Sequence, residues 1–348
     1  MKHGKTLATL GVGALAAVGT LATANNEAQG LFWEPATHFA LIGDTPYAEY
    51  QIDQVDEMLR EINASRAEFT LHVGDIKSGS SLCSDELLQT RFDQLQQLRA
   101  LVYTPGDNEW TDCHRKAAGM YEPLERLAKL RELFYPRPSF TTGQRPFRVY
   151  PQSSDEGYES FVENTLFVRS NVVIATLHVI GSNNNLALWD GIGESAEAPR
   201  QDRLDEVAAR EAANLAWIDR TFDAAEKIGA AGVLIAMQAD PAIEAAEGSA
   251  ARKGFEGILA KLAARSIAFN RPVVLAHGDS HYFRVDKPLP APTQDANVDD
   301  APRRLEDFTR VETFGDGEVH WVEVVIDPKT PEVFRFSARI VEANKYAR

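Results

Sequence analysis

Four short apolar segments of this chain each end in the same dipeptide, Gly-Asp, and the four aspartates are Asp44, Asp75, Asp107 and Asp279. Each segment is rich in β-forming residues and is bounded by a turn residue, so each predicts a buried strand. The glycine permits a sharp bend, and the carboxylate then lies just beyond the strand. In an open α/β sheet, ligands bind at this edge. Carboxylates that converge there need a cation or protonation to offset their repulsion, so we expect the four aspartates to build a metal site.

The spacing of the first three aspartates predicts how their strands are connected. Asp44 and Asp75 are 31 residues apart, and Asp75 and Asp107 are 32 apart. A strand–helix–strand unit has about this length. Apolar residues at helical spacing fill residues 48–65 and 84–98. The first third of the fold is therefore expected to be β-α-β-α-β with parallel strands.

The remainder of the chain continues with both kinds of element. Helical periodicity is present at residues 116–134, 201–228 and 250–268. β-rich runs predict strands at residues 160–168, 172–180, 232–237, 272–276, 319–326 and 333–341. The last two strands are expected to pair antiparallel, and Gly315-Asp316, just before them, indicates a hairpin turn. The fold class is α/β, and one large domain, residues 25–348, fits this organisation.

The first 24 residues have the pattern of a secretory signal peptide. Lys2 and Lys5 form a basic region, residues 7–21 are apolar, and Ala22-Thr23-Ala24 is a small-residue cleavage site. The alternative is an uncleaved membrane anchor. No other segment has the ~18 apolar residues that a membrane span needs. The protein is therefore expected to be exported, to the periplasm or out of the cell, with no membrane span in the mature chain.

The chain is acidic, which limits its partners. The formal net charge is −15, and loss of Lys2 and Lys5 with the signal peptide makes it −17. A phosphate backbone needs a basic face, so nucleic acid is not an expected partner. A small phosphoester stays compatible with this charge, because a bound metal supplies positive charge locally.

The two cysteines, Cys83 and Cys113, each follow a Gly-Asp strand end by a few residues. In an oxidising compartment they can form a disulfide. That bond would close a 31-residue loop and contribute about 3–4 kcal/mol in the chain-entropy model. Two free thiols are the alternative, and two sulfurs at this spacing do not match a cysteine metal site.

The order of the Gly-Asp dipeptides resembles the motif order of the calcineurin-like metallophosphoesterases. That family carries Asp-x-His, Gly-Asp, Gly-Asn-His-Asp/Glu, a lone His and Gly-His-x-His, all on loops that follow strands. The matching segments here are Gly43-Asp44-Thr45-Pro46, Gly74-Asp75, Gly106-Asp107-Asn108-Glu109, Gln238 and Gly278-Asp279-Ser280-His281. The resemblance spans most of the chain after the signal peptide. It implies an αββα sandwich, in which two mixed β-sheets are flanked by helices.

Several positions of the family pattern carry a different residue in this chain. Relative to the family, the replacements are Pro46 and Gln238 for histidines, Asp107 for an asparagine and Asp279 for the first histidine of the last motif. The resemblance implies two cation sites, one made by Asp44, Asp75 and His281 and the other by Asp75, Asp107, Gln238 and Asp279. Asp240 is an alternative donor near Gln238. Oxygen ligands suit Mn, Mg or Ca better than Zn or Fe, so one or two of these divalent ions are the expected cofactors.

The expected function is hydrolysis of a small phosphoester with the help of these cations. Asn108 occupies the family's catalytic position, but an amide cannot act as a general acid. The leaving-group proton is therefore expected from one of three side chains, His277, His114 or Glu109. The alternative is a non-catalytic relative that keeps the fold and binds a ligand or a single cation. A third interpretation is a plain α/β scaffold without metal, against which the aspartate cluster argues.

Two further segments are candidates for substrate contacts. Lys77 lies two residues after Asp75, where its ammonium could offset negative charge or contact a phosphate. The Asn-rich turn after the strand at 172–180 supplies Asn183 and Asn184, whose amides could hold a polar substrate.

Overall fold

The four Gly-Asp segments form strands, as the sequence predicts: β1 (Thr37–Ile42), β2 (Phe69–His72), β3 (Leu101–Tyr103) and β8 (Val273–His277). The computed structural model describes Met1 and residues 35–291 and 303–345. The α/β fold lies in one compact unit, Ala36–Arg348. The predicted signal peptide, residues 1–24, lies outside the described residues apart from Met1. Among the described residues, no helix has both the length and the apolar character needed to cross a membrane.

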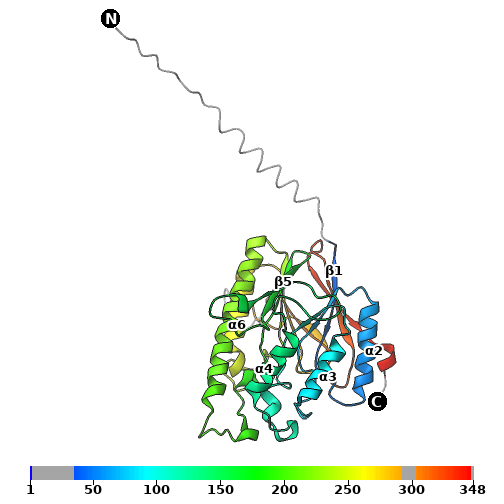
Figure 1. The fold of residues 1–348 in the computed structure, drawn as a ribbon. Helices are drawn as coiled ribbons and strands as arrows, with labels where there is room; N and C mark the ends of the chain where they lie inside the picture. Colours follow the sequence, from blue (N-terminus) through cyan, green and yellow to red (C-terminus); the bar gives the residue numbers. More distant parts are fainter. Residues whose placement is uncertain (2–34, 292–302, 346–348) are drawn as a thin grey trace. The chain divides into compact units, whose positions relative to one another are not determined.

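The strands build two mixed sheets (Figure 1). The five-stranded sheet has the order β12-β11-β1-β2-β3, in which β1, β2 and β3 are parallel, as predicted, and β11 (Trp321–Ile326) and β12 (Phe334–Arg339) are antiparallel. The seven-stranded sheet has the order β4-β5-β6-β7-β8-β10-β9. Its central strands β6, β7, β8 and β10 are parallel, and its margins are antiparallel. The further strands of this sheet are β4 (Tyr150–Pro151), β5 (Thr165–Arg169), β6 (Val172–Thr176), β7 (Gly232–Ala236), β9 (Arg284–Asp286) and β10 (Phe308–Glu312).

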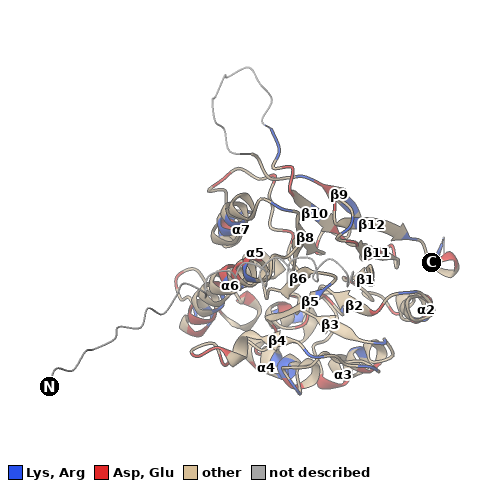
Figure 2. Cartoon of the chain, turned by 90° about the horizontal axis from the view of Figure 1, so that it is seen from above, with Lys and Arg blue, Asp and Glu red and all other residues tan. Residues whose placement is uncertain are grey.

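Helices cover the outer faces of both sheets (Figure 2). On the five-stranded sheet these are α2 (Gln51–Ala64), α3 (Asp85–Leu95) and α4 (Pro123–Phe134). On the seven-stranded sheet they are α6 (Gln201–Ile228) and α7 (Glu256–Phe269). A third apolar layer fills the space between the sheets, where the rings of Phe39 and Phe69 stack with centroids 4.7 Å apart. The predicted α/β sandwich with two mixed sheets is confirmed.

The helix predicted at residues 116–134 is wrong in its first part. Lys116–Ala118 form only a 3-10 turn, and α4 begins at Pro123. Between them, Gly119 has a φ of 101° and Met120 a φ of 58°. A left-handed backbone cannot continue a right-handed helix, whereas the fixed φ of proline suits the first helical position.

Three short strands, β4, β9 and β10, have no counterpart in the sequence prediction. β4 has two residues and β9 has three, and β10 mixes charged and apolar residues, so none shows a clear strand pattern. Gly315-Asp316 forms a turn, with the Glu318 amide donating to the Gly315 carbonyl at 3.0 Å. This turn leads from β10 in one sheet to β11 in the other, so the predicted hairpin is wrong.

A buried ionic network joins α4 to the seven-stranded sheet. Glu163 is fully buried and accepts hydrogen bonds from Arg131 Nη2 at 2.6 Å and Nε at 3.1 Å. His178 Nδ1 lies 2.8 Å from the same carboxylate. Burial alone would raise the pKa of Glu163, but Arg131 and His178 outweigh it and hold that pKa below its usual value. The ionised carboxylate therefore stabilises the fold.

The Glu163→Gln variant should lose about 3 kcal/mol of unfolding free energy at neutral pH, because Arg131 and His178 then lose their buried partner. A carboxylate with a lowered pKa contributes stability above its unfolded pKa of about 4.3 and loses it as the pH falls toward the folded value. The difference in unfolding free energy between wild type and variant should therefore become smaller below about pH 4. Urea denaturation across this range measures both effects, and a gap independent of pH would contradict them.

Candidate functional site

The structure brings the four strand-end aspartates to one place, although they come from both sheets. Carboxylate oxygens of Asp75, Asp107 and Asp279 lie within 4.8 Å of one another. Asp44 adjoins them, because its Oδ1 accepts a hydrogen bond from the Asp279 amide at 3.0 Å. His281 Nε2 lies 3.8 Å from the same oxygen. We call these five residues the acid cluster: Asp44, Asp75, Asp107, Asp279 and the neighbouring His281.

The backbone of the acid cluster is locally strained. Asp44, Asp75, Asp279 and His281 have φ angles of 56°, 59°, 78° and 60°. Left-handed backbone is uncommon for residues with a Cβ, costs about 1–3 kcal/mol each, and concentrates at functional sites. Four of the five cluster residues therefore adopt a conformation that the surrounding packing has to maintain.

Glycines let the acid cluster close up. A Cβ on Gly278 would lie 2.1 Å from Asp44 Oδ2, and one on Gly106 would lie 2.0 Å from Asp75 Oδ1. Gly181, from the loop after β6, would place a Cβ 2.7 Å from Asp107 Oδ2. The glycines of the Gly-Asp dipeptides thus serve for close approach as well as for bending.

The carboxylates of the cluster oppose one another's ionisation. Burial, and then the charge of Asp279, raise the pKa of Asp44 well above its usual value. Burial, and then the charge of Asp107, also raise the pKa of Asp75 well above its usual value. The same two causes raise the pKa of Asp279 to about 8. Asp44 Oδ2 is buried and finds no hydrogen-bond donor among the described residues. The protein's own groups therefore leave the negative charge of this cluster incompletely compensated.

Gln238 and Asp240 lie beside the cluster and hold Asp279. Gln238 Nε2 donates to Asp279 Oδ1 at 3.1 Å, while its Oε1 accepts from the Gly181 amide at 2.6 Å. The Asp240 amide donates to Asp279 Oδ2 at 3.0 Å. The carboxylate of Asp240 instead accepts from Ser280 Oγ at 2.5 Å and from Arg284 Nη2 at 2.8 Å. In this structure both residues fix the position of Asp279.

Tyr47 belongs to the site and was missed by the sequence analysis. Its hydroxyl donates to Asp75 Oδ2 at 2.5 Å and accepts from Asn108 Nδ2 at 2.7 Å. Asn108 Nδ2 also donates to Asp75 Oδ2 at 2.5 Å, and the Tyr47 ring packs edge-on against His281 at 5.0 Å. The only sequence signal is its place three residues after Asp44, in the same strand-end loop.

The predicted proton donors lie behind the cluster rather than in the cleft. Glu109 is fully buried, and its Oε1 accepts from Tyr103 and from the amides of Asp75 and Gly106. His277 is fully buried, with Nδ1 2.8 Å from the Gly278 carbonyl. Burial raises the pKa of Glu109 and lowers that of His277 to about 4.

His114 is also buried, and its Nδ1 accepts from the Gly191 amide at 3.2 Å. None of these three side chains lines the cleft described below.

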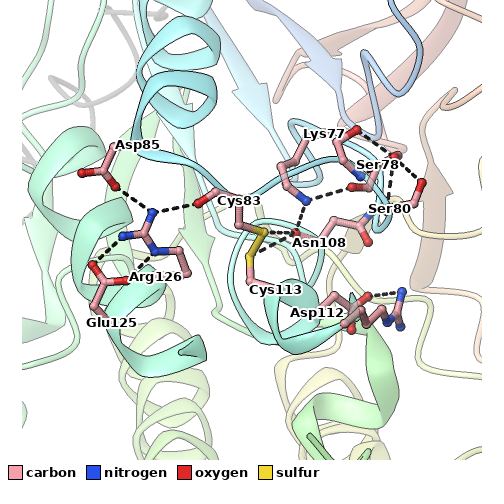
Figure 3. The surroundings of a disulfide bond; sticks show 12 residues. Lys77, Ser78, Ser80, Cys83, Asp85, Asn108, Asp112, Cys113, Glu125 and Arg126 are labelled. Atoms are coloured by element: carbon pink, nitrogen blue, oxygen red, sulfur yellow. Dashed lines mark hydrogen bonds and ion pairs between the residues drawn. A yellow bond between two sulfur atoms is a disulfide. The ribbon is translucent and has the colours of Figure 1, made fainter. Parts of the chain in front are cut away.

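Lys77 lies next to the disulfide, with its ammonium toward Asn108 (Figure 3). Its ammonium is fully buried and donates to the carbonyls of Ser78 at 2.8 Å and Asn108 at 2.6 Å. Burial lowers the pKa of Lys77 to about 8, although Glu109 and Asp75 oppose that shift. Lys77 therefore braces the Asn108 loop and does not line the cleft.

The predicted disulfide between Cys83 and Cys113 is present. It joins the loop after β2 to the loop after β3, and both sulfurs lie 3.7 Å from the Asn108 carbonyl oxygen (Figure 3). The bond thus ties together the two loops that supply Asp75 and Asp107. A disulfide is compatible with an exported protein.

The Asn-rich turn forms α5 (Gly181–Asn185) with left-handed φ angles at Ser182, Asn183 and Asn184. Asn183 Nδ2 donates to the Ala250 carbonyl, and Asn184 Nδ2 donates to the Gly254 carbonyl, each at 3.0 Å. These amides hold the turn against the segment before α7. Ser182 is the residue of this turn that faces the site, with its Oγ 2.9 Å from Asp107 Oδ2.

An open cleft of about 660 Å³ lies over the acid cluster. Its lining includes four aspartates, Asp75, Asp107, Asp112 and Asp279. The other lining residues are Tyr47, Ser78, Gly79, Ser80, Asn108, Arg115, Ala117, Ser182 and His281. Most of the lining residues are therefore polar or acidic, and the cleft is large enough for a small molecule.

The donor set of the cluster fits a hard divalent cation. Asp44, Asp75, Asp107 and Asp279 supply carboxylate oxygens, the ligands that Mn, Mg and Ca prefer, and His281 adds one imidazole. The buried Asp44 Oδ2 without a partner is the atom that such an ion would satisfy. The residues present are thus chemically suited to the metal that the sequence analysis expected.

Comparisons with known proteins do not assign the chain to a family. No protein-family model matches it, and no curated protein matches it. A solved structure described as "GAP50 the anchor in the inner membrane complex of Plasmodium" aligns over 88% of this chain and 89% of its own, with 11% identity and a TM-score of 0.45. Similarity at this level assigns neither a family nor an activity.

The Gly106→Ala variant should lose about 1–3 kcal/mol of unfolding free energy, because the new Cβ overlaps Asp75 Oδ1 and lies 2.5 Å from the Asp75 amide nitrogen. Gly257→Ala in α7 is the matched control. Its Cβ meets mainly the end of the flexible Glu211 side chain at 2.8 Å, and alanine favours a helix by up to about 1 kcal/mol. Urea denaturation compares the two, and equal stabilities would mean that the cluster is not tightly packed.

Replacing Cys83 and Cys113 together by serine should cost about 3–4 kcal/mol, since the loop that the disulfide closes regains its freedom in the unfolded chain. Denaturation of the double variant is compared with wild type in the presence and absence of dithiothreitol. Reduced wild type should resemble the variant. If both are as stable as oxidised wild type, the disulfide does not brace the loops of the site.

Proposed function

We propose that this protein is a metal-dependent phosphoesterase that hydrolyses a small phosphoester at the acid cluster. The observation that carries the proposal is the convergence of four aspartates from two sheets. One of these aspartates, Asp44, keeps a buried carboxylate oxygen without a partner among the described residues. Mutual repulsion of this size at a cleft is explained by a cation that offsets it. The order of the strand-end motifs supports assignment to a divergent branch of the calcineurin-like metallophosphoesterases.

The residues that would hold the metal are Asp44, Asp75, Asp107, Asp279 and His281, with Mn, Mg or Ca favoured by their oxygens. Bound there, the ion would supply Lewis acidity toward a phosphoryl oxygen and would lower the pKa of water. Gln238 Oε1 remains a further oxygen donor, although its present role is to accept from Gly181.

The chain's own residues orient the cluster and line the cleft. Tyr47 and Asn108 both bind Asp75 Oδ2, which fixes the rotamer of the carboxylate central to the proposed site. Outside the ligand set, Asp112 lines the cleft with both oxygens engaged: its Oδ2 lies 2.7 Å from Arg115 Nη1, and its Oδ1 accepts from Ser182 Oγ at 2.7 Å. We assign to this carboxylate the orientation of Arg115 at the cleft.

A non-catalytic metal-binding protein is the second candidate, and a specific observation favours it. Glu109 and His277, the expected acids, are buried behind the cluster, and the Asn108 amide is fully engaged with Asp75 and Tyr47. An ion could then be held without the proton transfers that hydrolysis requires. For both candidates we propose export to the periplasm or out of the cell, which the N-terminal pattern and the disulfide support.

The stability of an Asp75→Asn variant relative to wild type should depend on whether metal is present. Without metal, the variant should be at least as stable as wild type, because one repelling carboxylate is neutralised. With Mn²⁺ at about 100 times its Kd, wild type should gain about 2.7 kcal/mol and the variant much less. Thermal unfolding with and without Mn²⁺ measures this, with Asp93→Asn on the exposed face of α3 as control. Equal Mn²⁺ effects on wild type and Asp75→Asn would refute the metal site.

Hydrolysis of p-nitrophenyl phosphate and bis-p-nitrophenyl phosphate with added Mn²⁺, Mg²⁺ or Ca²⁺ tests catalysis. Turnover that requires the metal and is lost in Asp75→Asn supports the phosphoesterase. Turnover should also fall in Asp112→Asn, because Arg115 then loses the carboxylate that orients it. Tight Mn²⁺ binding without turnover of either ester would favour the non-catalytic candidate instead.

A further inference from the structure

The cleft contains one permanently cationic side chain among its described lining residues, Arg115. The lining also includes four aspartates, and the nearby Lys77 is buried beneath the floor with its ammonium bound to two carbonyls. A negatively charged substrate that enters this cleft therefore meets positive charge from the protein at Arg115, with His281 as the only other basic group of the lining.

Arg115 is held in place from one side and open on the other. Its Nη1 lies 2.7 Å from Asp112 Oδ2, and its Nη2 donates to Ser182 Oγ at 3.4 Å. The side chain of Asp112 is only 3% exposed, whereas that of Arg115 is 46% exposed. The buried carboxylate thus orients the guanidinium while nearly half of the arginine side chain stays accessible to solvent.

The loop after β2 approaches Arg115 closely because it carries a glycine. A Cβ on Gly79 would lie 2.7 Å from Arg115 Nη1 and 2.6 Å from Asn108 Oδ1. Ser78 and Ser80, on either side of Gly79, also line the cleft. The guanidinium therefore lies next to the Ser182 hydroxyl and close to Asn108, which itself binds Asp75.

We infer that Arg115 binds the non-bridging oxygens of the substrate's phosphoryl group and so selects an oxyanion for this cleft. This inference rests on the proposed function, and it assigns to Arg115 the role that the sequence analysis gave to Lys77. A guanidinium is planar, remains charged at all relevant pH values and can donate two parallel hydrogen bonds to a phosphoryl group. In an acidic cleft, that fork also offsets the repulsion between the substrate and Asp112, the lining aspartate outside the proposed metal site.

The test measures binding of inorganic phosphate to the Mn²⁺-loaded protein by calorimetry, in wild type, Arg115→Gln and Arg115→Lys. Phosphate affinity should fall about 10- to 100-fold in Arg115→Gln, the range expected for one or two charge-assisted hydrogen bonds. Arg115→Lys should recover part of that loss, since it restores the charge without the fork. Arg60→Gln is the matched control, because Arg60 pairs with Glu57 at the same three-residue spacing on the surface of α2.

Mn²⁺ affinity is measured on the same proteins before phosphate is added, and should change by less than about twofold in Arg115→Gln, because Arg115 is not a ligand. Unchanged phosphate affinity in Arg115→Gln would overturn the inference, and so would a wild type that binds Mn²⁺ but no phosphate. A parallel loss of Mn²⁺ affinity would also overturn it, since Arg115 would then only support the metal loops.

Kinetic measurements with the two esters distinguish a failure of this inference from a failure of the proposed function. If p-nitrophenyl phosphate and the diester are hydrolysed, Arg115→Gln should raise the KM of the substrate that Arg115 binds more than it lowers kcat. A larger effect on the monoester identifies a phosphomonoester as the substrate class, and a larger effect on the diester identifies a diester. Arg115-dependent phosphate binding without hydrolysis would retain the inference and remove the phosphoesterase.

Discussion

Repulsion among carboxylates that follow strands of both sheets is the constraint around which this structure is organised. Two carboxylates ~4 Å apart oppose each other by about 4 kcal/mol at an effective dielectric of 20, and here Asp44, Asp75, Asp107 and Asp279 meet in one cluster. The fold can support this because its stability comes from three apolar layers that do not involve these residues. The sandwich holds the aspartates together, and the cluster in turn leaves a site whose most direct stabilisation is a cation.

The protein compensates part of the buried charge around the acid cluster itself and leaves the rest without a partner among the described residues. Lys77 places a buried ammonium next to Asn108, and Glu109 is satisfied on one oxygen by Tyr103 and two backbone amides. The disulfide closes the same region from below. By contrast, Asp44 Oδ2 and the second oxygen of Glu109, Oε2, are buried and have no donor in the described part of the chain. Buried carboxylate oxygens without a partner, close to a cleft, distinguish this region from a merely acidic surface.

The parts of this fold that depend on local patterns were predictable. The spacing of the Gly-Asp dipeptides gave the parallel strands, and helical periodicity gave α2, α3 and α6. The start of α4 was not, because the left-handed Gly119 and Met120 interrupt an otherwise helical pattern. Side-chain direction was not predictable either: Glu109 and Lys77 are adjacent to ligand positions in sequence, yet tertiary packing turns them beneath the cleft. Tyr47 carried no motif, and only the fold shows that its hydroxyl reaches Asp75.

The ligand set also determines how tightly an ion would be held. That affinity in turn indicates which role the ion would have. Affinity for hard cations is tuned by the number of charged ligands and by the rigidity of the site. Here the ligand charge is high, and the left-handed backbone at Asp44, Asp75 and Asp279 together with the glycine contacts restricts adjustment. A rigid, charge-rich site suits an ion that stays bound while a substrate exchanges above it. The open cleft, with Arg115 at its lining, would allow that exchange, and it supports the proposed catalysis on a small oxyanion over a buried structural ion.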